Sequence, residues 1–202
     1  MKLIVMTKST FFVEEDKIIS TLFEEGMDGL HLFKPASEPV YSERLLSLLP
    51  DDYYRRITVH HHFYLCQEYG LRGIHLDDPE MELPYGYRGH HSRTCTSLDQ
   101  LRLSKKKADY VFLKPVFESQ TQAASQQAFS LDELKAASKQ GLIDRHVYAL
   151  GGVTLDNIRL LADIGFGGVV VCDDLWNRFD IHQGQDYKEL IAHFRKLQKA
   201  VY

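Results

Sequence analysis

The chain has 202 residues, 44% of them apolar and 26% charged, a composition that excludes disordered, collagen-like and coiled-coil proteins. Lys and Arg number 24 against 28 Asp and Glu, a net charge of −4, and because no basic stripe stands out the sequence argues against nucleic-acid binding. Three cysteines without CxxC spacing disfavour a disulfide framework or structural zinc site, whereas histidine is frequent, with ten residues.

Eight short apolar or β-branched runs recur along the chain. The runs are mostly continuous rather than alternating, which is typical of strands that are covered on both faces. We predict strands at residues 2–7, 29–34, 57–60, 73–76, 90–94, 110–114, 147–150 and 168–172.

Helical patterns lie between most of these runs. Apolar residues at helical spacing predict helices at 16–25, 98–103, 131–138, 155–164 and 187–197. Ser130 opens an S-x-x-E capping box, and Thr154 is predicted to cap the helix at 155–164. Glycines stand where helices should end, at Gly26, Gly70, Gly141 and Gly165. The segment 77–89, rich in Pro and Gly, is predicted to lack a regular helix.

Eight strand–helix units in a chain of this length fit a single (β/α)8 TIM barrel, an α/β fold, formed by one domain over residues 1–202. A doubly wound open sheet is the rival fold. The first strand is not followed by a G-x-G-x-x-G turn, and together with the count of eight units this favours the barrel.

The apolar run near the amino terminus is too short for a signal-peptide core, and no apolar stretch elsewhere is long enough to span a bilayer. We therefore expect a cytoplasmic protein without membrane partners. The sequence leaves open whether copies of the chain associate into a homo-oligomer.

Polar residues gather at the ends of the predicted strands, where a barrel keeps its catalytic groups. Lys34 and Lys114 each precede a proline at a strand end, and an ammonium group there needs an anion such as phosphate. Gly151 and Gly152 follow the seventh strand, where backbone N–H groups of barrels often hold a phosphate.

The histidines allow two interpretations. The run at 60–62 is either a solvated strand end or part of a metal site, in which His61, His75 and Asp77 would converge. Such a site would make the protein a Zn²⁺- or Mn²⁺-dependent barrel enzyme. No H-x-H or H-E-x-x-H spacing supports that alternative.

Several segments together carry a family likeness: GLHLFKP (29–35), GIHL (73–76), TCTSLDQL (94–101), ADYVFLKPVFESQTQ (108–122), ALGGVTLDNI (149–158) and GFGGVVV (165–171). On these segments the chain resembles the thiamine phosphate synthase and thiazole tautomerase superfamily. The resemblance implies a (β/α)8 barrel. It also implies an enzyme that joins a pyrimidinylmethyl diphosphate to thiazole phosphate, releases pyrophosphate and uses Mg²⁺.

The resemblance assigns candidate roles to individual residues. Lys34 would contact pyrophosphate as the catalytic lysine, and the remaining positions would bind substrate or phosphate: His31, Thr94, Lys114, Ser119, Thr121, Gly151, Gly152 and Asp173. Mg²⁺ would be held near His61, Asp77 and Glu80. Small phosphorylated heterocycles are the expected partners.

The sequence departs from the family pattern at four positions. Phe33 stands where the family has an arginine, His61 where it has a metal-binding Asp, Gln122 where it has a lysine, and Asp173 where it has a small residue. These changes remove positive charge from the part of the site that would bind the diphosphate. They leave in place Gly151 and Gly152, which we call the glycine cup because they are predicted to hold a phosphate. The changes favour a second interpretation, in which the chain is a thiazole tautomerase-like protein or a module that binds a phosphorylated ligand.

Overall fold

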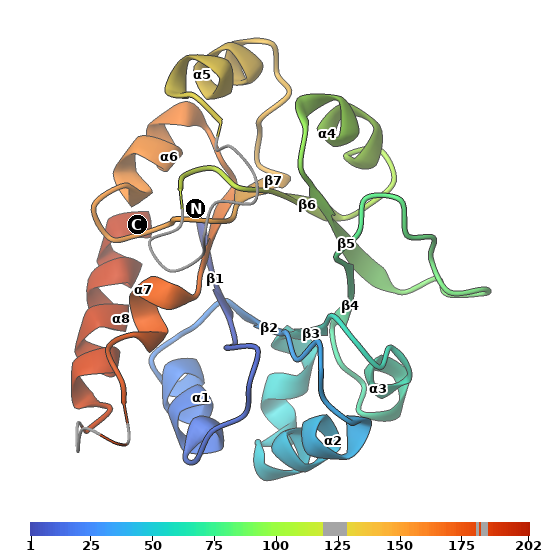
Figure 1. Ribbon diagram of the computed structural model, residues 1–202, viewed down its shortest axis with the longest axis vertical. Coiled ribbons are helices and arrows are strands. Elements are labelled where there is room, and N and C mark those ends of the chain that lie inside the picture. The colour runs from blue at the N-terminus through green and yellow to red at the C-terminus, as the bar shows by residue number, and fades with distance from the viewer. Residues whose placement is uncertain (119–128, 181, 183–185) are drawn as a thin grey trace.

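The computed structural model describes residues 1–118, 129–180, 182 and 186–202. Its eight strands are all parallel, each pairs with the next, and β8 closes onto β1 (Figure 1). The strands are β1 Lys2–Met6, β2 Gly29–Leu32, β3 Ile57–Val59, β4 Gly73–Leu76, β5 His90–Cys95, β6 Tyr110–Leu113, β7 Val147–Ala149 and β8 Gly168–Val171. The predicted TIM barrel is confirmed, and the open-sheet alternative is wrong.

Helices surround the strands as an outer layer (Figure 1). They are α1 Glu15–Glu24, α2 Pro39–Leu48, α3 Tyr64–Glu68, α4 Leu98–Ser104, α5 Leu131–Lys139, α6 Ile158–Ile164, α7 Asp173–Trp176 and α8 Lys188–Val201, with the 3-10 helix η1 at Asp51–Arg56. The sequence did not predict α2, α3, α7 or η1. In α2 only three of ten residues are buried, so its apolar stripe is narrow.

Of the two predicted helix N-caps, one is correct and one is wrong. At α5 the capping box is present, because Ser130 Oγ accepts from the Glu133 N–H and the Glu133 carboxylate accepts from the Ser130 N–H. Thr154 is not an N-cap: α6 begins at Ile158, and the Thr154 N–H donates to Asn157 Oδ1 (3.0 Å). A turn therefore occupies 154–157. The segment 77–89 lacks a helix, as predicted.

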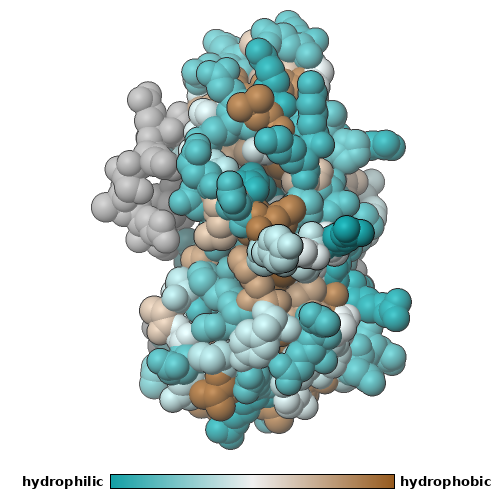
Figure 2. All heavy atoms as spheres, turned by 90° about the vertical axis from the view of Figure 1, so that its right-hand side faces the viewer, coloured by the Kyte–Doolittle hydropathy of each residue, from teal (hydrophilic) through white to brown (hydrophobic). Residues whose placement is uncertain are grey.

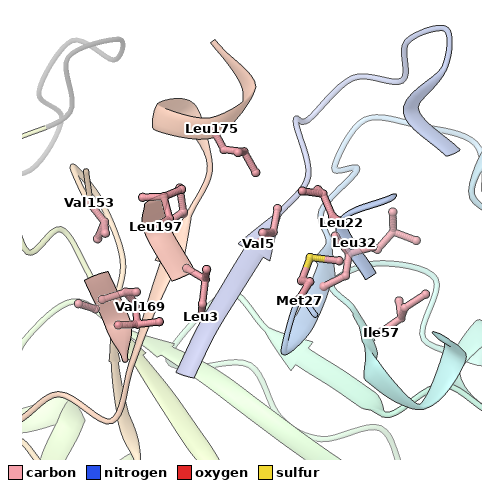
Figure 3. Packing of buried hydrophobic residues seen from close by; sticks show 14 of the residues in the cluster. Leu3, Val5, Leu22, Met27, Leu32, Ile57, Val153, Val169, Leu175 and Leu197 are labelled. Atoms are coloured by element: carbon pink, nitrogen blue, oxygen red, sulfur yellow. The ribbon is translucent and has the colours of Figure 1, made fainter. Parts of the chain in front are cut away.

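Apolar side chains form two layers. The larger one lies between strands and helices, where Leu3 and Val169 on the barrel wall approach Leu197 of α8 (Figure 3). A smaller one fills part of the barrel interior, the lumen. Burial on both faces explains why the strand sequences are continuous apolar runs.

The face at the right of Figure 1 is mainly hydrophilic, with small separated apolar patches (Figure 2). Such scattered apolar residues are normal on a protein surface. Among the described residues, no helix combines the length and apolarity needed to cross a membrane.

Candidate functional site

The lumen has an apolar side and a polar side. Strands β1, β6 and β8 contribute the apolar cluster of Ile4, Met6, Tyr110, Phe112 and Val170. Strands β2 to β5 contribute buried polar residues, namely His31, Thr58, His60, His75, Ser92 and Thr94. Burying polar groups costs free energy unless they are hydrogen-bonded, so their partners decide what this side of the lumen does.

We call the open end of the lumen, at the carboxyl ends of the strands, the mouth. A chain of hydrogen bonds runs from the mouth down the polar side of the lumen. Asp77 Oδ1 lies 2.8 Å from His60 Nδ1, His60 Nε2 lies 2.8 Å from His31 Nδ1, and His31 Nε2 lies 2.7 Å from the Tyr110 hydroxyl. The Asp77 side chain is 30% exposed, whereas that of His60 is fully buried. The chain therefore connects a carboxylate at the mouth to a tyrosine in the interior.

His75 lies beside this chain. Its Nδ1 is 2.6 Å from Ser92 Oγ, its Nε2 is 2.8 Å from Thr94 Oγ1, and its ring stacks on His60 with 4.3 Å between centroids. Burial lowers the pKa of His75 well below its usual value, and the neighbouring His60 lowers it further. Burial has the same effect on the pKa of His31. Both rings are therefore neutral at pH 7.

The predicted metal ligands do not gather into one group. His60, rather than His61, contacts Asp77, and Glu80 is exposed in a turn where its N–H donates to Asp78 Oδ1. Among the described residues, the group of three that could hold an ion is His31, His60 and His75. Mg²⁺ is typically held by one or two carboxylates together with substrate phosphates, so the predicted Mg²⁺ site, with Asp77 as its carboxylate at the mouth, stays a prediction.

Lys34 points away from the mouth. Phe33 packs with the lumen cluster, and strand alternation turns Lys34 to the other side, toward α1. There its Nζ lies 2.7 Å from Glu15 Oε1, donates to the Thr10 carbonyl oxygen (2.8 Å) and lies 4.4 Å from the Phe11 ring centroid. Contact with pyrophosphate stays a prediction that requires this buried pair to open.

Lys114 follows β6 at the mouth and is half-buried. Its ammonium group has no hydrogen-bond partner in the part of the chain that the structure describes. Thr94, the predicted substrate contact on the neighbouring strand β5, is buried and bonded to His75. Asp173, at the start of α7, is exposed. Burial raises the pKa of Cys172 to about 12, and the negative charge of the neighbouring Asp173 adds to that rise.

The predicted phosphate cup has the backbone that glycine permits. Gly151 and Gly152 have φ values of +94° and +63°, and a Cβ on Gly152 would lie 2.7 Å from the Glu118 carbonyl oxygen and from Phe117 Cβ. Asn157 Nδ2 donates to the Gly152 carbonyl oxygen (2.8 Å) and braces the turn. Ser119 and Thr121, predicted to bind substrate or phosphate, lie outside the described residues, as does Gln122.

Sequence reasoning missed Glu15, Tyr110 and Ser92. The signal for the lumen residues is a polar side chain inside an otherwise apolar strand, as in the two similar strands GLHL (29–32) and GIHL (73–76). Two-residue alternation then places such a histidine in the lumen once the barrel is known. No sequence signal pairs Glu15 with Lys34.

Comparison with known proteins identifies the family. The sequence model of the thiamine monophosphate synthase family matches residues 43–175, more than half of the chain. The chain belongs to this family. The match spans strands β3 to β8, and with them the histidine-rich mouth and the glycine cup.

Individual family members agree with this assignment. A thiamine-phosphate synthase of Koribacter versatilis is 30% identical over 113 residues, 52% of each chain, and one of Serratia proteamaculans is 26% identical over 72% of this chain and 68% of its own length. The chain thus spans about half of the Koribacter relative's length.

Solved structures extend the likeness. A thiamine phosphate pyrophosphorylase from Bacteroides thetaiotaomicron is 49% identical, with a TM-score of 0.90 over 99% of this chain and 97% of that one. A Pyrococcus furiosus thiamine phosphate pyrophosphorylase, 18% identical with a TM-score of 0.76 over 99% of this chain and 95% of that one, shares the fold.

Proposed function

We propose that the chain couples a pyrimidinylmethyl diphosphate to thiazole phosphate and releases pyrophosphate. In this reaction the thiazole nitrogen forms a bond to the methylene carbon while the bond from that carbon to the diphosphate oxygen breaks. The family membership and the braced Gly151–Gly152 turn support the proposal, and the turn is the observation that carries it.

The cup would hold the phosphate of the thiazole substrate. The positive φ values turn the backbone so that N–H groups can face an anion at close range. A fixed phosphate positions the thiazole ring, and positioning supplies much of the rate in a substitution of this kind.

Lys114 would neutralise the leaving diphosphate in place of the buried Lys34. Its ammonium group lies at the mouth, and an uncompensated cation there stabilises negative charge that develops on the leaving group. Phe33 adds an aromatic surface beside His60 and His61, with ring centroids 5.4 and 5.6 Å away. We expect this surface to contact the heterocyclic rings. Asp77 would hold Mg²⁺ together with the diphosphate, and a bound Mg²⁺ would help to neutralise the leaving group.

The test is formation of thiamine phosphate from both substrates by the purified protein. Gly152→Ala should lower kcat/KM by about a hundredfold, because the new methyl group meets Phe117 and Glu118 and closes the cup. Gly141→Ala is the matched control: its φ is similar, +70°, but nothing lies within 4 Å of its Cβ. Equal losses in the two variants would show that backbone strain, rather than the cup, decides activity.

The second candidate is a non-synthase member that binds the phosphorylated heterocycle, either as a tautomerase-like protein or as a binding module. Phe33 favours it, because the ring brings no positive charge to the diphosphate half of the mouth. Calorimetry separates the two candidates. Binding of thiazole phosphate without binding of pyrophosphate supports the second, and binding of pyrophosphate that Lys114→Gln abolishes supports the first.

A further inference from the structure

We propose that His31, His60 and His75, the lumen histidines, form a site for a transition-metal dication such as Zn²⁺. The three rings come from β2, from the end of β3 and from β4, which are consecutive strands of the barrel, and each residue is at most 3% exposed. One ring nitrogen of each lies within 4.8 Å of the other two. The proposal does not depend on the coupling reaction.

Oxygen partners hold the rings from outside. Asp77 binds His60 through Nδ1 and leaves Nε2 facing the cluster, and the Tyr110 hydroxyl binds His31 through Nε2 and leaves Nδ1 facing the cluster. His60 already has the arrangement of metal-bound histidines, whose second nitrogen typically donates to a carboxylate or another oxygen and thereby fixes the ring, and His31 reaches it when its proton is on Nε2.

His75 supplies the third nitrogen. Both of its nitrogens face hydroxyl groups, Ser92 Oγ at 2.6 Å and Thr94 Oγ1 at 2.8 Å. A hydroxyl can rotate away, so one nitrogen can turn to the ion while the other keeps its partner. Thr94 or a water molecule would complete a tetrahedral set.

The His31–His60 pair needs only a small movement to admit an ion, whereas His75 must turn further. His31 Nδ1 and His60 Nε2 are 2.8 Å apart and share a hydrogen bond, whereas two nitrogens at about 2.0–2.1 Å from one tetrahedral Zn²⁺ lie roughly 3.3 Å apart. The pair therefore opens by about half an ångström, and the His75 ring turns off its stack on His60. The His31 proton moves from Nδ1 to Nε2, where it donates to the Tyr110 hydroxyl oxygen, so no proton is released.

The chemistry of the cluster selects the ion. Three imidazoles suit Zn²⁺, Co²⁺ or Ni²⁺, whereas Mg²⁺ and Ca²⁺ require oxygen ligands. Burial keeps the His31 and His75 rings neutral, as ligation requires, and the Asp77 carboxylate beside His60 offsets part of the positive charge of the ion.

The experiment titrates Co²⁺ into metal-free protein without a His tag and follows visible absorption. We expect one equivalent of Co²⁺ to give an intense tetrahedral spectrum that one equivalent of Zn²⁺ removes. His75→Gln should weaken Co²⁺ binding at least a hundredfold, and His146→Gln, on the surface, should not change it. Absence of the tetrahedral spectrum, or an equal effect of both substitutions, would overturn the proposal.

A second measurement uses the unsubstituted protein, so it does not depend on a lumen variant that folds. Zn²⁺ should shift the imidazole ¹⁵N resonances of three buried histidines at one equivalent, with coupling activity recorded separately. Shifts confined to exposed histidines such as His146 would mean surface binding only and would contradict the site.

Discussion

The ion pair of Lys34 and Glu15 shows how neighbouring side chains alter the chemistry of one residue. Both side chains are at most 2% exposed, and Glu15 Oε2 is buried and has no hydrogen-bond partner among the described residues. Burial raises the pKa of Glu15 and lowers the pKa of Lys34, in each case against the attraction of the partner. Desolvation thus outweighs the pairing, and the pair depends on both members.

Glu15→Gln should lower the free energy of unfolding by about 3–5 kcal/mol, because it leaves the buried Lys34 charge without its counter-charge. Urea denaturation measures the loss. Glu24→Gln, on the exposed side of the same helix, is the control and should change stability by less than about 0.5 kcal/mol. Equal effects of the two substitutions would mean that the ion pair does not form.

Helix starts illustrate the scale of single elements. Ser130 and Thr154 looked alike in sequence, since each is a hydroxyl residue before an apolar position and an acidic one. Ser130 caps α5, because its Oγ accepts from the Glu133 N–H three residues on. At 154 the corresponding N–H, that of Asn157, donates to the Thr154 carbonyl oxygen in a turn, and α6 begins at Ile158. The acceptor that takes the N–H group three residues on, side-chain hydroxyl or backbone carbonyl, decides which signal succeeds.

Ser130→Ala should therefore lower the free energy of unfolding by about 1 kcal/mol, because the Glu133 N–H at the start of α5 loses its partner, the Ser130 hydroxyl. Thermal or urea unfolding measures the change. Thr154→Ala should stay within about 0.5 kcal/mol, since its hydroxyl caps no helix. A larger loss for Thr154→Ala than for Ser130→Ala would contradict the observed helix starts.

The lumen histidines affect the stability of the whole barrel, because their strands lie on one wall of it. The pKa values of His31 and His75 are depressed in the folded chain, so below about pH 6.5 the unfolded chain takes up protons that the folded chain does not. The stabilisation is complete above that pH and is lost as the pH falls.

Between about pH 7.5 and pH 5.5, each of the two rings should therefore lower the free energy of unfolding by about 1.4 kcal/mol. Urea denaturation at the two pH values, in the presence of a chelator, measures the loss. His75→Gln should reduce the pH dependence by about half of the two-ring effect, and His146→Gln should leave it unchanged. A wild-type protein whose stability does not change over this range would contradict neutral buried rings.

Most of the fold was predictable because each strand carries its own signal. Continuous apolar runs and their count indicated the eight strands, and the Gly-rich turn after β7 indicated the cup. The orientation of Lys34 and the grouping of the lumen histidines were not predictable, since each depends on residues far apart in the chain. His31 and His60 are 29 positions apart, and His31 and Tyr110 are 79 apart.

The sequence by itself determined the barrel, the family likeness and the position of the glycine cup, because strand periodicity and turn chemistry are local properties. Only the tertiary structure decided which of the clustered histidines face one another and which lysine is held in a buried ion pair. The physical reason is closure: when β8 pairs with β1, side chains from neighbouring strands converge on one lumen, and burial there replaces water with specific partners.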